Sequence, residues 1–208
     1  LTAELLNDIQ TQSERLSRLV DGILDLGHLE SGQIRLDLVD LDVAGLVLQV
    51  SQEVAKAHPN HEIAAIPAEK PLIVWADRDR VDQVIRNVLD NAVKYSPQGS
   101  AVAVHVLRDG YGVRVAVSDE GIGIPPDQRE LVFERFFRIH TAFTASVPGT
   151  GLGLATCRAI IEAHGGRIWI EPHDSDQAFP GTTVVFTLPG PAPALQSCEG
   201  CTDGDGPC

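Results

Sequence analysis

The first thirty residues of the chain repeat apolar side chains at the spacing of a long helix. Two seams recur at multiples of seven residues, with one glutamine interrupting them: Leu5, Ile9, Gln12, Leu16, Leu19, Ile23 and Leu26. Such heptad spacing is typical of a coiled coil or a helical bundle, although an amphipathic helix that packs on its own domain would also produce it. We predict one coiled-coil-like helix over residues 3–30, which Ser31-Gly32 ends.

From residue 33 to residue 189 the apolar positions switch between strand spacing and helix spacing. Alternation predicts strands over residues 34–41, 61–66, 71–75, 101–107, 113–118, 167–171 and 182–188. Helical spacing predicts helices over residues 43–54, 81–92 and 151–164, and a short one over 127–137. Asp77 is the expected cap of the second of these helices, and Asp109-Gly110 is the expected hairpin turn. This mixture predicts an α/β (α+β) two-layer sandwich, with three helices on one face of a mixed β-sheet.

The last part of the chain, residues 190–208, is rich in Pro, Gly and Asp and is predicted to be a disordered tail. The chain therefore divides into residues 1–32, 33–189 and 190–208. Cys198, Cys201 and Cys208 lie in the tail, where a metal or redox site is the alternative, although three thiolates make a poor closed zinc site. Because the cysteines do not resemble a disulfide framework, a reducing, cytoplasmic setting is expected.

A net charge of −13 restricts the classes of partner. An acidic surface cannot neutralise phosphate groups, so we expect no nucleic acid partner and no contact with anionic lipid. No apolar stretch reaches the ~18 residues that span a bilayer, and no signal segment opens the chain. The chain contains no methionine, so we expect it to be a piece or processed product of a longer protein, which a membrane could still anchor elsewhere.

Two asparagines on the second predicted helix form the first candidate site. Asn87 and Asn91 are four residues apart and share a helix face, and Lys94 follows one turn later. A neutral amide oxygen is a hard ligand that suits Mg²⁺ already carrying phosphate, and a lysine can contact phosphate. Taken alone, these residues could equally decorate a solvated helix face.

Asp119 ends a predicted strand, and Gly121 and Gly123 follow it. An ionised carboxylate only accepts hydrogen bonds, so it can accept one from the exocyclic amine of adenine, whereas guanine presents a carbonyl oxygen there. The glycines let the backbone approach a base or a sugar without a Cβ in the way. The alternative is a turn with a surface aspartate.

A second glycine turn, residues 149–154, opens the third helix. Glycine amides at a helix N-terminus can bind a triphosphate, and the spacing matches neither a Rossmann turn nor a Walker loop. About 25 residues separate the two glycine turns, which is long for a structureless connection and predicts a functional lid. Phe133, Phe136 and Phe137 could anchor this lid, and Arg135 and Arg138 could meet phosphate or a partner. A mobile surface loop is the alternative.

In this order the motifs resemble the N, G1, F and G2 boxes of sensor histidine kinases, within the superfamily of Bergerat-fold ATPases. The resemblance covers residues 33–189. The N-terminal helix within residues 1–32, which ends in Leu26-Gly-His-Leu-Glu-Ser-Gly32, resembles the second helix of the dimerisation and phosphoacceptor hairpin. It implies a catalytic domain that uses ATP and Mg²⁺ to phosphorylate a histidine, for onward transfer to a response-regulator aspartate. The implied partners are the protein's own phosphoacceptor hairpin, a response regulator and a second subunit of a homodimer.

The resemblance also assigns roles to single residues. Asn91 would coordinate Mg²⁺ with Asn87 assisting, and these two are the candidate catalytic residues. Lys94 would contact phosphate, and Tyr95 would lie against the nucleotide. Asp119 would recognise adenine with the help of Thr182. The other nucleotide-binding positions would shape the pocket and the lid: Gly121, Gly123, Ile124, Arg138, Gly149, Thr150, Gly151, Leu152, Gly153 and Leu154.

One departure concerns the phosphoacceptor. In the family it lies in a box like His-Glu-Leu-Arg-Thr-Pro, and none of the seven histidines here does, so this piece is not expected to phosphorylate itself. Related hydrolases and serine kinases place a glutamate four residues before the metal-binding asparagine as a general base. Here that position is Asn87, whereas an imidazole nucleophile needs little help from a base. This favours histidine phosphorylation; a degenerate nucleotide-binding module, or a Bergerat-fold ATPase or serine kinase, are the alternatives.

Overall fold

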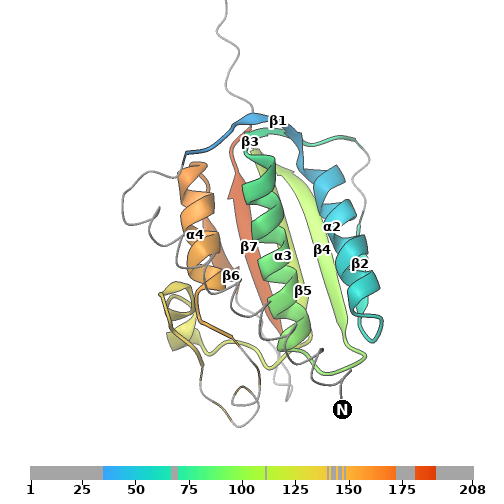
Figure 1. Ribbon diagram of the computed structural model, residues 1–208, viewed down its shortest axis with the longest axis vertical. Helices are drawn as coiled ribbons and strands as arrows, with labels where there is room; N and C mark the ends of the chain where they lie inside the picture. Colours follow the sequence, from blue (N-terminus) through green and yellow to red (C-terminus); the bar gives the residue numbers. More distant parts are fainter. Residues whose placement is uncertain are drawn as a thin grey trace, which may run out of the picture.

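A mixed five-stranded sheet forms one layer of the domain (Figure 1). The computed structural model describes residues 35–66, 70–110, 112–139, 141, 144, 147, 149–171 and 181–190. The strands lie in the order β2 (Glu62–Ala65), β4 (Ala101–Asp109), β5 (Gly112–Asp119), β7 (Thr182–Leu188) and β6 (Ile168–Glu171). β2 runs parallel to β4 and the other neighbours are antiparallel, which confirms the predicted mixed sheet.

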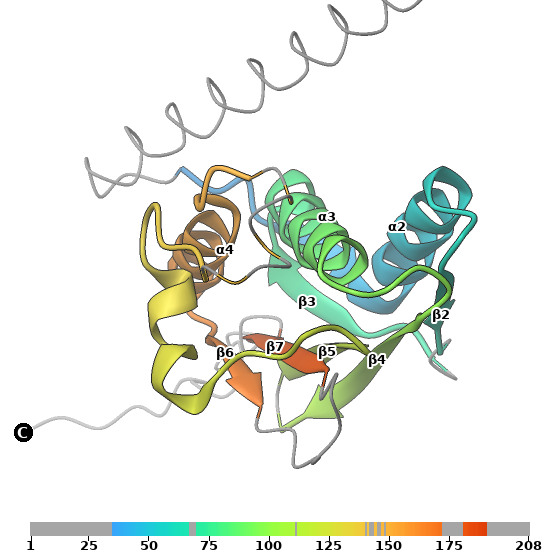
Figure 2. The same cartoon turned by 90° about the horizontal axis from the view of Figure 1, so that it is seen from below.

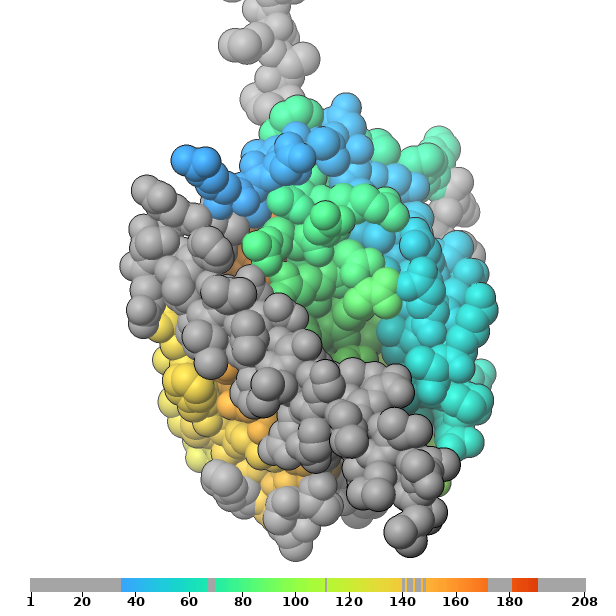
Figure 3. Space-filling model, viewed as in Figure 1, coloured from blue at the N-terminus to red at the C-terminus, as the bar shows by residue number. Residues whose placement is uncertain are grey.

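The α-helices of the described chain lie on one face of this sheet (Figure 2): α2 (Val43–Ala57), α3 (Arg78–Lys94) and α4 (Gly153–Ala163). A separate antiparallel pair, β1 (Val39–Asp42) and β3 (Ile73–Ala76), lies at one end of the helix layer. None of these helices has the length and the apolar composition needed to cross a bilayer. The space-filling view shows α3, in green, at the surface beside α2, in cyan (Figure 3).

The core lies between the helix layer and the sheet. Every second residue of the first part of β4 is buried, as the alternation predicted, and α3 buries a face of apolar side chains toward β4 and β5. The side chains at its centre are almost completely inaccessible to solvent: Ile85, Leu89, Val102, Val104, Val115, Ile161 and Phe186. A rigid, central α3 is therefore available to carry polar side chains at its edge.

The helices that flank the candidate site have well-defined ends. Asp77 caps α3 as predicted, because its Oδ1 accepts hydrogen bonds from the backbone N of Asp79 and Arg80 at 3.0 and 3.1 Å. At the same end of the layer, Gly165-Gly166 closes α4 with a Schellman motif, in which Gly165 adopts a φ of 76°.

Asp77 also joins three parts of the chain. Its Oδ2 accepts a hydrogen bond from Asp37 N at 2.9 Å, and its own amide donates to Nε2 of the buried His164, just after α4, at 3.0 Å. Burial raises the pKa of Asp77, but the backbone hydrogen bonds from Asp37, Arg80 and Asp79 outweigh it and leave the pKa below its ordinary value. The ionised carboxylate of Asp77 therefore links the backbone at Asp37, just before β1, to the start of α3.

The helix predicted over residues 127–137 was wrong: two short 3₁₀ turns, η1 (Pro126–Gln128) and η2 (Leu131–Phe133), take its place. The third helix begins at Gly153 rather than near 151, because Gly151 has a φ of 74° that a right-handed helix cannot contain. Among described residues, β1 starts only at Val39, since it pairs with just the four residues of β3. The helix predicted over residues 3–30 and the tail predicted over 190–208 lie outside the described residues, apart from residue 190.

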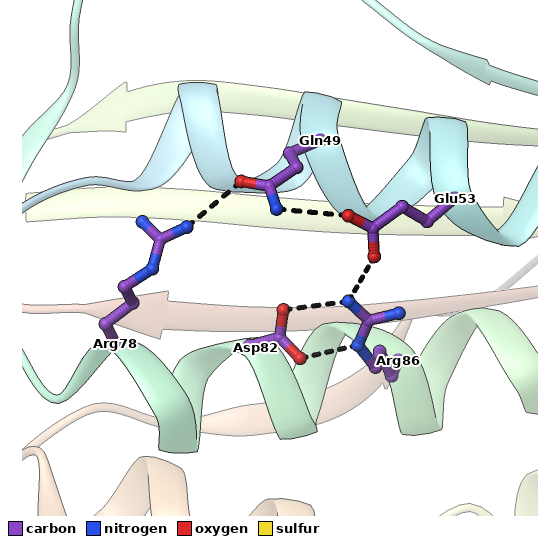
Figure 4. Close-up of polar contacts among 5 residues, drawn as sticks. All are labelled: Gln49, Glu53, Arg78, Asp82 and Arg86. Atoms are coloured by element: carbon purple, nitrogen blue, oxygen red, sulfur yellow. Dashed lines mark hydrogen bonds and ion pairs between the residues drawn. The ribbon is translucent and has the colours of Figure 1, made fainter.

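A chain of polar contacts joins the outer faces of α2 and α3 (Figure 4). Arg78 donates to Gln49 Oε1 at 3.0 Å, Gln49 donates to Glu53 at 3.1 Å, and Arg86 bridges Glu53 and Asp82 at 2.5 and 2.6 Å. The hydrogen bonds from Arg86 and Gln49 lower the pKa of Glu53. Because Glu53 and Arg86 are exposed, the network aligns the two helices more than it stabilises the fold.

Candidate functional site

The two asparagines lie at the edge of α3 that faces the start of α4. Both Asn87 and Asn91 are half-buried. Val84, which precedes them, and Val88, which lies between them, point into the core. The position that a Cβ on Gly153 would occupy is 4.0 Å from Asn87 Cγ. The structure thus places the first candidate motif directly beside the second glycine turn, 66 residues later in the chain.

Cys157 lies one turn along α4 from Gly153 and was not predicted as part of the site. Its Sγ is 3.9 Å from the backbone oxygen of Val84, and the residue is completely buried. Burial raises the pKa of the Cys157 thiol to about 12, although a hydrogen bond with the Asn87 side chain partly opposes the rise. The thiol is therefore neutral near pH 7 and packs beneath Asn87.

Tyr95, which follows the last turn of α3, lies near both glycine turns. Its backbone oxygen accepts a hydrogen bond from Ile122 N at 3.2 Å, and its hydroxyl is 4.0 Å from the position of a Cβ on Gly149. The preceding Lys94 forms an ion pair with Asp90, Nζ to Oδ2, at 3.8 Å. Both residues are half-buried at the end of α3, and this is where the predicted contacts with phosphate and nucleotide would be made.

Asp119 stands at the end of β5, and backbone amides from two different segments fix its carboxylate. Oδ1 accepts hydrogen bonds from Gly121 N at 2.8 Å and from Thr182 N, the first residue of β7, at 3.1 Å. The resemblance implied help from Thr182, and in the structure its amide contacts Asp119. The backbone of Gly181 also lies against Asp119. Its φ is 73°, and a Cβ at this position would lie 2.1 Å from Asp119 O, so only glycine fits.

Gly121 is required by close packing rather than by its φ. A Cβ at this position would lie 2.6 Å from Tyr95 O and 2.7 Å from Asp119 Oδ1. It would also lie 3.1 Å from the Oγ of Ser96, a buried hydroxyl that has no hydrogen-bond partner in the described part of the chain. A buried hydroxyl without a partner beside Asp119 fits a site that a polar ligand or water completes.

The middle of the segment between the glycine turns contacts the second turn. Phe136 N donates to Gly151 O at 3.0 Å, and a Cβ on Gly151 would lie 2.7 Å from the carbonyl carbon of Phe136. Phe136 has a φ of 63°, the left-handed region, and its side chain is 66% exposed. By contrast Phe133, which is 3% exposed, anchors the segment in the core, as predicted. The same prediction was wrong for Phe136, because its side chain points away from the core.

Arg138, predicted to contact phosphate, binds backbone carbonyl groups of the same segment. Its guanidinium donates to Gly149 O at 3.1 Å, to Val147 O at 2.6 Å and to Thr144 O at 3.3 Å. The guanidinium is thus beside the second glycine turn and holds the backbone that leads into it. Contact with phosphate stays a prediction.

The remaining candidate residues line these two turns. Gly123 is buried with a φ of 73°, Ile124 packs against the core, and Thr150 Oγ1 accepts a hydrogen bond from Leu152 N at 3.3 Å. Leu152 and Leu154 are apolar supports of the first turn of α4. No group of three or more His, Cys, Asp or Glu side chains among the described residues is arranged to hold a metal ion on its own.

A family model described as histidine kinase-, DNA gyrase B- and HSP90-like ATPase matches residues 76–192, which include both glycine turns and the asparagine pair. The chain belongs to this ATPase family. Within the family it is similar to sensor histidine kinases: WalK of Bacillus subtilis (strain 168) is 35% identical over 184 residues, 86% of this chain and 29% of WalK. The chain spans 29 to 47% of the curated relatives that it matches.

Solved structures of histidine kinases share both fold and sequence with this ATPase domain. Mycobacterial sensor histidine kinase MprB is 34% identical with a TM-score of 0.64, over 76% of this chain and 99% of that chain. Histidine kinase ThkA, in complex with the response regulator protein TrrA, is 27% identical with a TM-score of 0.64, over 85% of this chain and 48% of that chain. The chain is accordingly a catalytic ATP-binding domain of the sensor histidine kinase type.

Proposed function

We propose that this domain transfers the γ-phosphoryl group of ATP to a histidine on a phosphoacceptor helix. The observation that carries the proposal is the carboxylate of Asp119, held by two backbone amides beside a glycine turn and across from the end of α3. In the transfer, the imidazole nitrogen attacks the γ-phosphorus, ADP leaves with the electrons of the broken P–O bond, and the imidazole proton is released.

Adenine recognition is assigned to Asp119. Two amides that donate to one oxygen orient the carboxylate and favour its charged, acceptor-only form. Such a group accepts a hydrogen bond from an exocyclic amine and repels the carbonyl oxygen of guanine. The buried Ser96 hydroxyl, which has no hydrogen-bond partner among the described residues, supplies a polar group at this turn that a ligand or a water can complete.

The phosphates and Mg²⁺ are assigned to the space between α3 and the start of α4. Asn91, with Asn87 assisting, supplies hard amide oxygens that suit Mg²⁺ bound to phosphate, and Lys94 can exchange its weak pair with Asp90 for a phosphate. The free amides of the first turn of α4, preceded by Gly149 and Gly151, favour anions. Bound Mg²⁺ would neutralise phosphate charge as the P–O bond breaks.

Transfer is favoured over hydrolysis by the residue one turn before Asn91. Asn87 cannot take a proton near neutral pH, and its side chain contacts the Cys157 thiol. A water nucleophile would need a general base here, whereas a neutral imidazole already has a lone pair. The polar groups of this site can therefore position and neutralise charge, which is what phosphoryl transfer to histidine requires.

Three further assignments extend the proposal to the whole chain and its partners. Residues 33–189 form the catalytic domain with the segment 125–148 as its lid, residues 1–32 the second helix of a dimerisation hairpin, and residues 190–208 a tail. The partners are the hairpin that bears the histidine, in a homodimer, and a response regulator. ThkA, a relative of this fold, was solved with its response regulator TrrA, which supports the second partner.

The test mixes this chain with γ-labelled Mg-ATP and the separately expressed histidine-bearing hairpin of its parent protein. The expected result is acid-labile, alkali-stable label on the hairpin. ATP binding without label would favour a nucleotide-binding module, and phosphate release without the hairpin would favour a hydrolase. The variant Asn91→Ala should remove both label and Mg²⁺-dependent ATP affinity, and unchanged Mg²⁺ dependence in calorimetry would refute the assignment of Asn91.

A further inference from the structure

One arginine clamps the first half of the lid segment onto α4. Arg158, in the second turn of α4, places its guanidinium over the ring of Phe133, 4.5 Å from the centroid. The same guanidinium pairs with Glu130 at 2.8 Å and with Glu134 at 3.8 Å. Its side chain is only 24% exposed, so a single cation meets one buried ring and two carboxylates of the segment 130–137, here termed the phenylalanine segment.

A second contact holds the other end of this segment. Phe136 N donates to Gly151 O, and backbone atoms of Phe136 and Phe137 lie where any Cβ on Gly151 would have to be. From Gly151 to Arg158 is about two helical turns, so the phenylalanine segment is fixed at two points along the start of α4. Phe136, with its exposed side chain and left-handed backbone, forms the second of these points.

The asparagine side of the site uses the same stretch of α4. Gly153 faces Asn87 and Cys157 packs beneath it, whereas Arg158 projects toward the phenylalanine segment. The start of α4 therefore connects the residues assigned to Mg²⁺ and phosphate with the base of the lid. A change in the clamp would move the lid base relative to the amides at the helix N-terminus.

We propose that Arg158 is a positioning residue for nucleotide binding: its guanidinium, through Phe133, Glu130 and Glu134, holds the base of the lid against the helix whose N-terminus receives the phosphates. This inference rests on the proposed function for its ligand, but the clamp itself is a property of the protein. Arg158 acts through these neighbours and touches no reacting atom.

The test compares Arg158→Met with Arg158→Lys in the full chain. Methionine keeps an apolar stem and removes the charge, whereas lysine keeps a cation over Phe133 and a pair with Glu130. We expect Arg158→Met to raise the dissociation constant of Mg-ATP about three- to tenfold, as the loss of a largely buried cation–π contact and of ion pairs with exposed carboxylates implies. Arg158→Lys should restore the affinity to within about twofold of the wild type. An equal loss of affinity in both variants overturns the proposal.

Amide hydrogen exchange gives a second measurement that does not depend on ATP. The amides of Phe133, Glu134 and Phe136 are hydrogen-bonded within the clamp, and they should exchange faster in Arg158→Met while β5 is unchanged. Unchanged exchange of these three amides, together with unchanged ATP affinity, overturns the proposal. The matched control Arg167→Met changes an exposed arginine beyond the far end of α4 and should alter neither measurement.

The two measurements separate the inference from the function on which it rests. If the wild type does not bind Mg-ATP, the proposed function fails, and the exchange data still decide whether Arg158 fixes the phenylalanine segment. If the wild type binds Mg-ATP and Arg158→Met binds it equally well, the positioning role fails and the proposed function stands.

Discussion

Replacing Asp119 by asparagine isolates the charge of one carboxylate from its geometry. Oδ1 accepts hydrogen bonds from Gly121 N and Thr182 N, and the carbonyl oxygen of an asparagine can accept both. The second carboxylate oxygen becomes an NH₂ group, which donates instead of accepting. The turn should therefore keep its shape, while its affinity for an exocyclic amine is lost.

The size of the effect follows from the type of bond removed. A hydrogen bond to a charged group contributes about 1.5–3 kcal/mol, which corresponds to a loss of affinity of roughly 10- to 150-fold. Two donors that face each other would increase the loss. Because both backbone bonds survive in the variant, the free energy of unfolding should change far less than the free energy of ATP binding.

Calorimetric titration of wild type and Asp119→Asn with Mg-ATP measures this loss directly. Urea unfolding of the same samples shows whether the fold is retained. The matched control is Asp109→Asn at the β4–β5 hairpin, where asparagine before Gly110 also suits the turn and ATP affinity should not change. A loss of less than about threefold for Asp119→Asn would refute the reasoning and place adenine elsewhere.

Two further predictions test the backbone around the site. Gly151→Ala should destabilise the fold by about 1–3 kcal/mol in urea unfolding, because alanine must adopt a φ of 74° and meets Phe136; an unaffected unfolding midpoint would show that the segment can move aside. Asp77→Asn should make the free energy of unfolding less dependent on pH at acid pH. Folding lowers the pKa of Asp77, so its carboxylate stabilises the folded state at pH values above its ordinary pKa of 3.8. This stabilisation is lost as the pH falls below 3.8. Equal wild-type and variant slopes of stability between pH 5 and pH 3, a range of about two units around that value, would contradict this assignment.

The sequence was most informative where functional groups share one regular element. Asn87 and Asn91 lie on one helix face because of their spacing alone, and the alternation of β4 predicts which of its side chains are buried. The cap at Asp77, which was predicted, and the end of α4, predicted at residue 164, are local as well. Such features need only the residues within a few positions of one another.

Contacts between distant segments could not be predicted in this way. No local pattern indicates that Thr182 N reaches Asp119, 63 residues earlier, or that Cys157 packs beneath Asn87. Residues 127–137 were wrongly predicted as one helix because their order comes from short 3₁₀ turns and from contacts with distant residues, such as Phe136 N with Gly151 O and Arg158 with the Phe133 ring. These arrangements depend on the packing of whole elements, which periodicity does not contain.

The strand order has a consequence for how the edges of the sheet meet neighbouring molecules. The outermost strands, β2 and β6, have four residues each, whereas the three inner strands have nine, eight and seven. Exposed strand edges are where sheets of neighbouring molecules join and aggregate, and short edges offer few unpaired backbone groups for that purpose. The long, apolar strands of this sheet are thus shielded at its centre, which limits sheet-to-sheet adhesion between neighbouring molecules.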